Sequence, residues 1–195
     1  MKKATLALAL LPMVSFAESD LQGLYAGVDI GLFNTIELEA LGMSADQDID
    51  GLPFNIYAGY DVVPTKNVSI GFEAEYRWLS EGKYKSAGQT ILKVEGYGLS
   101  INVRPKFRIP QSPVYVGLLA GFGQYKNKAT VYIDGDRMSD SATNTGWQYG
   151  AELGYILENN LVVSLGYRTA KIDIDEGVDL EAKQSGFNLG IQYRF

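Results

Sequence analysis

The chain has 195 residues and a net charge of −6, and 46% of its residues are hydrophobic against 21% charged. This length suits one domain, the balance excludes a disordered chain, and a negative chain without a basic run argues against nucleic acid as a partner. Cysteine and histidine are both absent, which excludes disulfides and thiolate metal sites and removes the commonest catalytic base.

The first segment, MKKATLALALLPMVSFAESD, has the layout of a secretory signal peptide. A basic start is followed by an apolar stretch and by the small-x-small cleavage site Ser15-Phe16-Ala17. We therefore expect residues 1–17 to be removed and residues 18–195 to form a single domain. A buried N-terminal helix is the alternative.

Beyond this segment apolar residues alternate with polar residues or glycine, and no apolar run is long enough for a transmembrane helix. The alternation predicts eight strands, near residues 22–33, 53–63, 67–79, 92–107, 114–126, 145–157, 161–172 and 183–195. Short turns (VPTKN, RIPQSP and ENN) alternate with long polar connections at 34–52, 80–91, 127–144 and 173–182. The pattern predicts an all-β fold: an antiparallel up-and-down barrel with short turns at one end and long loops at the other.

Two of the long connections are acidic. The first carries Asp46, Asp48 and Asp50 at alternate positions, like the start of a calcium-binding loop, but Tyr57 stands where that loop needs a glutamate. The second is KIDIDEGVDLE. We expect solvated loop charge rather than a metal site, and a weak divalent-ion site is the alternative.

The two faces of the predicted strands differ in composition. One face is apolar and carries aromatic residues toward the strand ends, as membrane girdles do: Trp78, Phe107, Trp147, Tyr155 and Tyr167. The other face holds the charges and the mid-strand glycines. Glycine would weaken a water-exposed strand but leaves room for large side chains in a narrow lumen, which favours a transmembrane barrel over a soluble one.

The charged face would then line the lumen. It brings together Glu73, Glu75, Arg77, Arg104, Lys106, Glu152, Arg168 and Arg194, with Asp29 and Asp61 near the strand ends. We expect mutually satisfied ion pairs, with Glu73 and Glu152 paired to arginines, because a buried unpaired charge costs several kcal/mol. The alternative is a gated ion path in which the pairs exchange partners.

The signal peptide, the openings YAGVDIG and YAGYD, the eight alternating strands and the closing LGIQYRF resemble the small outer-membrane β-barrel family. This family includes the OmpA-like transmembrane domain and the OmpX/Ail and Opa-type barrels. The resemblance covers the chain after the signal peptide and implies the outer membrane of a Gram-negative bacterium. It also implies contact with outer-membrane lipid and lipopolysaccharide, assembly by the barrel-assembly machinery, and a monomer.

Within that membrane some small barrels transfer palmitate to lipid A, deacylate lipid A or cleave peptides. The resemblance implies a histidine in each of these enzymes, and this chain has none. The segment Gly98-Leu99-Ser100 is not a G-x-S-x-G nucleophile elbow. We therefore expect no enzymatic activity and no cofactor.

The closing residues Tyr193 and Phe195 lie on the apolar face and resemble the C-terminal aromatic signal read by the assembly machinery. For function we expect a non-enzymatic barrel with a side-chain-filled lumen. Its role would be structural or envelope-stabilising, or adhesin-like through loops that contact a host or cell-surface ligand. The alternative is a small channel or porin for ions or an apolar solute.

Overall fold

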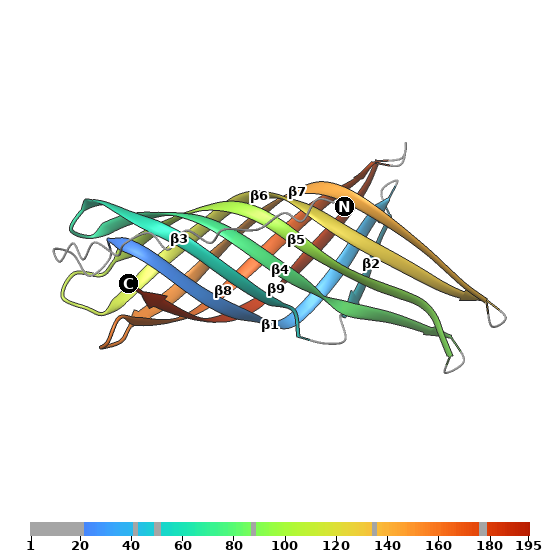
Figure 1. Cartoon of the computed structure of the whole chain (residues 1–195), viewed down its shortest axis with the longest axis horizontal. Helices are drawn as coiled ribbons and strands as arrows, with labels where there is room; N and C mark the ends of the chain where they lie inside the picture. Colours follow the sequence, from blue (N-terminus) through green and yellow to red (C-terminus); the bar gives the residue numbers. More distant parts are fainter. Residues whose placement is uncertain (1–21, 41–42, 49–51, 87–88, 134–135, 176–178) are drawn as a thin grey trace, which may run out of the picture.

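The computed structural model describes residues 22–40, 43–48, 52–86, 89–133, 136–175 and 179–195. The strands in order are β1 (Gly23–Ala40), β2 (Met43–Asp48), β3 (Phe54–Thr65), β4 (Val68–Ser86), β5 (Gln89–Arg108), β6 (Val114–Ile133), β7 (Asp136–Ile156), β8 (Leu161–Asp175) and β9 (Asp179–Arg194). Strands β1 and β3 to β9 pair antiparallel in chain order, and β9 pairs back with β1 (Figure 1). This closed ring confirms the predicted eight-stranded barrel. No helix among the described residues is long and apolar enough to cross a membrane.

The additional strand, β2, does not make a ninth strand of the barrel, because it pairs with the same edge of β1 as β3 does. β9 pairs with β1 along nearly its whole length, so β2 and β3 share the other edge of β1. β3 pairs with the first half of β1 and β2 with the second half, from Thr35 to Ala40. β2 and β3 therefore lie end to end and together form the neighbour of β1 in the barrel.

The two ends of the barrel differ. Short connections join β3 to β4, β5 to β6 and β7 to β8 at the end that also holds the C-terminus, at the left of Figure 1. At the opposite end the prediction of long loops was wrong in extent, because much of 34–52, 80–91, 127–144 and 173–182 is strand. The β6–β7 ladder, for example, continues to Ile133 and Asp136. Backbone pairing needs no hydrophobic alternation, so these strands continue where the apolar pattern stops.

The β7–β8 turn shows how the short connections form. Asn159 and Asn160 both have positive φ, at 67° and 63°, and the Leu157 N–H donates to the Leu161 carbonyl at 2.8 Å. Asparagine tolerates this left-handed backbone better than most residues, which allows a connection of only three residues, 158–160, between Leu157 and Leu161. The ENN segment is therefore a tight turn, as predicted.

The outward face is apolar and exposed. Ile101 is 70% exposed and Trp147 62% exposed, and the outward positions of every ring strand follow the same pattern. An apolar surface of this size is stable only when something apolar covers it. On β5 the outward stretch from Tyr97 to Phe107 spans ~25 Å along the barrel axis, at ~3.3 Å per residue and a tilt of ~40°, which matches a membrane band.

The inward face is mostly polar, and its buried apolar side chains include several tyrosines. Each of these tyrosines is the direct ladder partner of an inward glycine and lies across it. The pairs are Tyr25 with Gly59, Tyr57 with Gly27, Tyr115 with Gly154 and Tyr125 with Gly98. The inward glycines therefore serve packing, since the rings occupy the volume that a larger residue would need.

One irregularity interrupts β1. The register with β9 shifts between Leu32 and Thr35, and Phe33 has a φ of 51° and is 87% exposed. Positive φ is unfavourable for an aromatic residue and is characteristic of a bulge. The bulge places the Asn34 side chain inside the barrel, beside Gly31 and Gly186.

Candidate functional site

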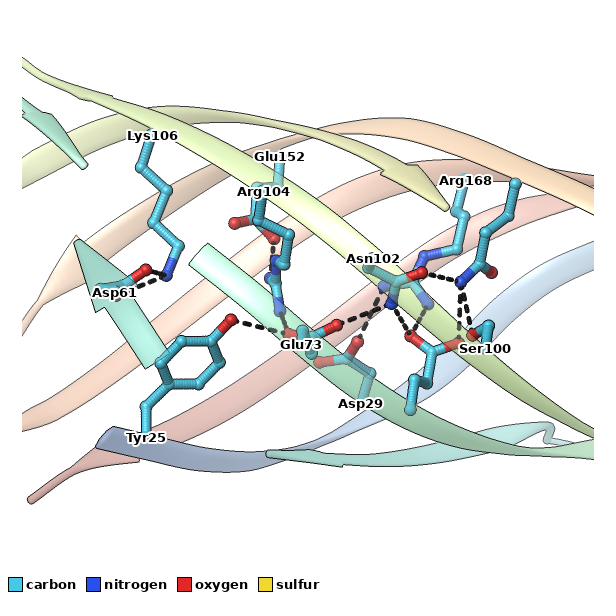
Figure 2. Close-up of polar contacts among 12 residues, drawn as sticks. Tyr25, Asp29, Asp61, Glu73, Ser100, Asn102, Arg104, Lys106, Glu152 and Arg168 are labelled. Carbon is cyan, nitrogen blue, oxygen red and sulfur yellow. Dashed lines mark hydrogen bonds and ion pairs between the residues drawn. The ribbon is translucent and has the colours of Figure 1, made fainter. Parts of the chain in front are cut away.

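The lumen holds the candidate site, and the barrel register determines which of its side chains meet. Alternate residues of a strand point inward, so β4 contributes Glu73, Glu75 and Arg77 while β5 contributes Arg104 and Lys106. The adjacent β4 and β5 carry charges of opposite sign at neighbouring levels. Figure 2 shows the resulting chain of contacts along the barrel interior.

Arg104 lies at the centre of this network. Its Nη1 is 2.5 Å from Glu73 Oε2, and its Nη2 is 2.5 Å from Glu152 Oε2 (Figure 2). Its guanidinium also lies 5.0 Å from the centre of the Tyr57 ring. One cation therefore joins β4 to β7 across the lumen, and both Glu73 and Glu152 contact an arginine.

Two tyrosine hydroxyls complete the hydrogen bonding of these carboxylates. Tyr25 donates to Glu73 Oε2 at 3.2 Å, and Tyr115 donates to Glu152 Oε1 at 3.2 Å. Both tyrosines are buried. Because a buried carboxylate is costly unless its lone pairs are satisfied, these donors stabilise the charged centre.

A second cluster surrounds Glu75, closer to the extended end of the barrel. Arg168 Nη1 contacts Glu75 Oε2 at 2.6 Å, while its Nη2 contacts Asp29 Oδ2 at 3.3 Å. Arg77 Nε lies 3.6 Å from Glu75 Oε1 and donates to Asn55 Oδ1 at 3.1 Å. Two arginines and two carboxylates thus share one layer of the lumen.

Amide side chains connect the two clusters. Asn102 donates to Glu73 at 2.8 Å and to Glu75 at 3.3 Å. Gln148 donates to Asn102 Oδ1 at 2.5 Å and to Ser100 Oγ at 2.9 Å. These uncharged residues were not among the predicted site residues, although their inward positions in the strand alternation marked them as lumen-facing.

A third cluster lies toward the end with the short turns. Lys106 Nζ donates to Asp61 Oδ2 at 2.9 Å, and Arg194 Nη2 lies 3.2 Å from the same oxygen. Lys106 Nζ also lies 4.4 Å from the centre of the Tyr25 ring. Asp61 therefore balances part of the positive charge of β5 and β9.

Taken together, the charges of the described lumen balance. The five acidic side chains are Asp29, Asp61, Glu73, Glu75 and Glu152, and the five basic ones are Arg77, Arg104, Lys106, Arg168 and Arg194. A hollow between Asp29, Glu152 and Arg168 measures about 20 Å³, which is room for about one water molecule. The side chains fill this part of the barrel interior.

The remaining predicted residues lie elsewhere. The girdle aromatics Trp78, Phe107, Trp147, Tyr155 and Tyr167 are exposed on the outward face, as are Tyr193 and Phe195. Within the acidic segment, Asp46 and Asp48 belong to β2, opposite Glu37 and Thr35 of β1, while Asp50 lies outside the described residues. In the described ranges no group of three or more acidic residues is arranged to hold a metal ion.

Comparison with known proteins places this geometry among outer-membrane barrels. Residues 4–195 match the family profile described as outer membrane protein beta-barrel domain. Among curated protein sequences, none matches this chain.

Solved structures show the same fold at low sequence identity. Neisserial surface protein A is 20% identical with a TM-score of 0.58, over 89% of this chain and 97% of that one. Ail, the attachment invasion locus protein of Yersinia pestis, is 21% identical with a TM-score of 0.54, over 89% and 99%. The outer membrane protease OmpT from Escherichia coli is 10% identical with a TM-score of 0.52, over 88% and 96%. Because these neighbours include a protease, the fold by itself does not decide whether the chain is an enzyme.

Proposed function

This chain belongs to the family of outer membrane protein beta-barrel domains and lies in the outer membrane of a Gram-negative bacterium, and we propose that it is a closed, non-enzymatic barrel that presents an interaction surface outside the cell. The observation that carries this proposal is the filled lumen. Arg104, bonded to both Glu73 and Glu152, spans the interior at its centre. A structural or surface role fits such a barrel better than transport through it.

The lumen network supports closure on energetic grounds. Moving Arg104 aside to open a path would leave the fully buried Glu73 side chain and the largely buried Glu152 side chain without a cation, at a cost of about 3–5 kcal/mol. The Arg168 contacts with Glu75 and Asp29 present a second barrier of the same kind. The channel interpretation requires both sets of ion pairs to exchange partners.

The same burial argues against catalysis in the lumen. The side chains of Glu73 and Glu75 have no exposed surface, and both are engaged by arginines. A general acid or base must reach its substrate. The chain also has no histidine to supply the base that the enzymatic small barrels would use.

The strand extensions support a surface role. Short turns mark the periplasmic end of such a barrel, so the extended strands lie outside the cell. There the β4–β5 ladder reaches Ser86 and Gln89 and the β6–β7 ladder reaches Ile133 and Asp136. The similar barrel Ail has been solved in complex with the heparin analogue sucrose octasulfate, which makes a sulfated polysaccharide a first ligand to test here.

Planar bilayer recording tests the closed lumen. We expect no stable single-channel conductance from the purified protein, because the ion pairs leave no continuous aqueous path. A steady, reproducible open level would overturn the closed barrel and favour the channel alternative.

Binding by intact cells tests the surface role. Bacteria that express the protein should bind immobilised heparin or another cell-surface ligand more strongly than bacteria that express a form with a shortened β6–β7 hairpin. Equal binding by both strains, at equal surface expression, would count against a role for the strand extensions.

A further inference from the structure

The barrel wall opens between β7 and β8 at the extended end. The β7–β8 ladder stops at Gly146 and Ile172, whereas the β6–β7 ladder continues along residues 136–145 of β7. In Figure 1 the β6–β7 hairpin and the β8–β9 hairpin point apart at the right of the picture. Among the described residues, none pairs with residues 136–145 on the side that faces away from β6. We call this side of the stretch the β7 edge.

The backbone groups of the β7 edge can be assigned residue by residue. The Ile156 N–H donates to the Pro113 carbonyl on the β6 side at 2.8 Å, and the Leu157 N–H donates to the Leu161 carbonyl on the β8 side at 2.8 Å. This direction alternates along a strand, and the β6–β7 register has no shift, so the odd-numbered residues of β7 face away from β6. The β7 edge therefore presents the backbone N–H and C=O groups of Arg137, Ser139, Ser141, Thr143 and Thr145.

A local hydrogen bond agrees with this assignment. The Ser141 N–H donates to Asp140 Oδ1 at 2.8 Å, so this donor is turned away from β6 and bonds the nearest carboxylate. A carbonyl of an added strand would replace that carboxylate. The side chains of the edge residues Ser139, Ser141, Thr143 and Thr145 are short and exposed, which leaves the backbone accessible.

The β7 edge lacks the devices that protect most exposed strand edges. Natural sheets protect an edge with a short strand, lysine, proline or a bulge. Residues 136–145 contain neither lysine nor proline, and their register with β6 is regular throughout. An unprotected edge of this length is a template for the addition of a strand from another polypeptide.

A second gap, between β3 and β4, does show these devices. The β3–β4 ladder stops at Phe54 and Trp78, while β4 continues to Ser86. Two register shifts interrupt the continuing β4–β5 ladder, and Lys83 and Lys85 belong to this part of β4. β2, which borders the same gap, has only six residues. The contrast between the two gaps singles out the β7 edge.

An extended polypeptide matches the β7 edge better than a sugar chain does. The edge repeats one donor and one acceptor at every second residue, about 6.8 Å apart, which is the repeat of a neighbouring antiparallel strand. β6 already demonstrates the match, because it pairs with the same stretch of β7 through the other backbone groups.

Charge adds a preference among polypeptides. Beyond the last β7–β8 pair, the two strands that border the gap carry Asp136, Asp140, Asp173 and Asp175 against Arg137. Lys126 and Lys128 belong to β6, one strand further from the gap. A neutral or basic segment is therefore favoured over an acidic one.

We propose that the β7 edge binds an extended segment of another protein by strand addition, with the segment antiparallel to β7 and beside β8. The inference rests on the proposed surface role and names the class of partner. The segment takes the position that β8 would occupy if the β7–β8 ladder continued, and it completes the backbone hydrogen bonding of residues 137–145. The ion pairs of the lumen stay in place.

A peptide with the sequence of residues 124–133, QYKNKATVYI, is a direct probe, because this segment of β6 already pairs with residues 136–145. The labelled peptide is titrated into the full protein in phosphatidylcholine nanodiscs and followed by fluorescence anisotropy. We expect saturable binding. A peptide with Ala129→Pro and Thr130→Pro should bind at least tenfold more weakly, because adjacent prolines remove a donor from each side of the strand. A peptide with Lys126→Glu and Lys128→Glu should also bind more weakly.

Thr143→Pro in the protein tests the edge itself. The Thr143 N–H faces away from β6, so proline blocks strand addition without removing a β6–β7 hydrogen bond. Peptide binding should weaken about tenfold. Thr143→Val, which keeps the N–H, is the matched control and should bind as the native protein does. The heat-dependent gel shift verifies that both variants are folded.

Amide hydrogen exchange in the native protein locates the peptide without any substitution. Bound peptide should slow the exchange of the N–H groups of Ser139, Thr143 and Thr145. Protection confined to other strands would overturn the proposal, as would equal peptide affinity of the Thr143→Pro and native proteins. Equal binding of the proline-containing peptide would show adsorption by side chains instead of strand addition.

Two further results would assign the edge to a different partner. Heparin that protects the same amide groups and displaces the peptide would make the ligand a polysaccharide. A dimer of the protein alone that disappears with Thr143→Pro would make it a second copy of this chain. Failure of the proposed function is distinguishable, because a stable conductance of the native protein overturns the closed barrel whatever the peptide does. Cells that express Thr143→Pro and still bind their surface ligand would exclude the β7 edge but retain the surface role.

Discussion

The ring of Tyr125 lies directly over Gly98, its partner in the β5–β6 ladder. A Cβ atom on residue 98 would lie 2.5 Å from that ring, and Tyr125 is 1% exposed, so the ring has little room to move. The relationship gives a physical reason for the glycines of the inward face. They are the sites at which the lumen accommodates aromatic rings.

Gly98→Ala should therefore destabilise the barrel by about 1–3 kcal/mol, the range for overpacking a filled interior. In a Tyr125→Ala background the same substitution should cost much less, because the ring that it displaces is gone. Urea unfolding in lipid vesicles measures both effects. Equal costs in the two backgrounds would rule out contact with the ring as the cause.

Arg104→Met should destabilise the protein more than any single change to its partners. The substitution leaves the buried Glu73 and the largely buried Glu152 without their shared cation, at a cost of about 3–5 kcal/mol. Glu152→Ala should cost less, since Arg104 keeps its contact with Glu73. The stability of the variants can be ranked by the temperature at which the folded band disappears on gels. If Glu152→Ala is as stable as the native protein, Glu152 does not form a stabilising ion pair with Arg104.

Opening the lumen on purpose is a stricter test of closure. A variant with Arg104→Ser, Arg168→Ser and Gln148→Ser removes the side chains that bridge the central layers. We expect conductance in planar bilayers that the native protein lacks. A matched variant with three serine substitutions on the outward face should show no conductance. If the lumen variant conducts no more than the native protein, these three residues do not block the path.

We propose Tyr193 and Phe195 as an assembly signal, and deletion of Phe195 tests it. The two rings pack edge to face with centres 5.1 Å apart on the outward surface. Deletion should lower the yield of inserted protein in cells more than it lowers the stability of protein refolded in detergent. Phe107→Ala, which removes another exposed girdle aromatic, is the control, and equal assembly yields for the deletion and the native protein would refute the signal.

We also propose that residues 1–17 are removed on export. The small-x-small triplet that ends at Ala17 predicts Glu18 as the first residue of the mature protein. Mass spectrometry of protein extracted from outer membranes would measure this end directly. A mature chain that still carries Lys2 and Lys3 would exclude cleavage.

Strand alternation alone determined the architecture of this protein. Because successive side chains of a strand point to opposite faces, the position of Arg104 or Glu152 in the sequence already assigned it to the polar face. The contrast between a charge-free apolar face and a glycine-rich polar face then separated a membrane barrel from a soluble one. Both properties depend on residues that are close together in the sequence, so they can be recognised without knowing which strands pair.

What the sequence left open depends on which strands become neighbours and in what register. Arg104 could have paired with several carboxylates, and only the closed ring brings Glu73 of β4 and Glu152 of β7 to its two sides. Buried tyrosines such as Tyr125 were missed because tyrosine suits either face, and the glycine opposite it lies on another strand.

The extent of the strands and the outer surface were likewise decided by tertiary structure. Ladders such as β6–β7 continue past the apolar pattern because the backbone pairing of two neighbouring strands needs no particular side chains. On the outward face, Ala58 meets Ala74 across the β3–β4 ladder, between the larger pairs Ile56 with Tyr76 and Tyr60 with Phe72. The shape of this surface is a property of the folded protein, since the facing residues come from two strands that lie side by side only after folding.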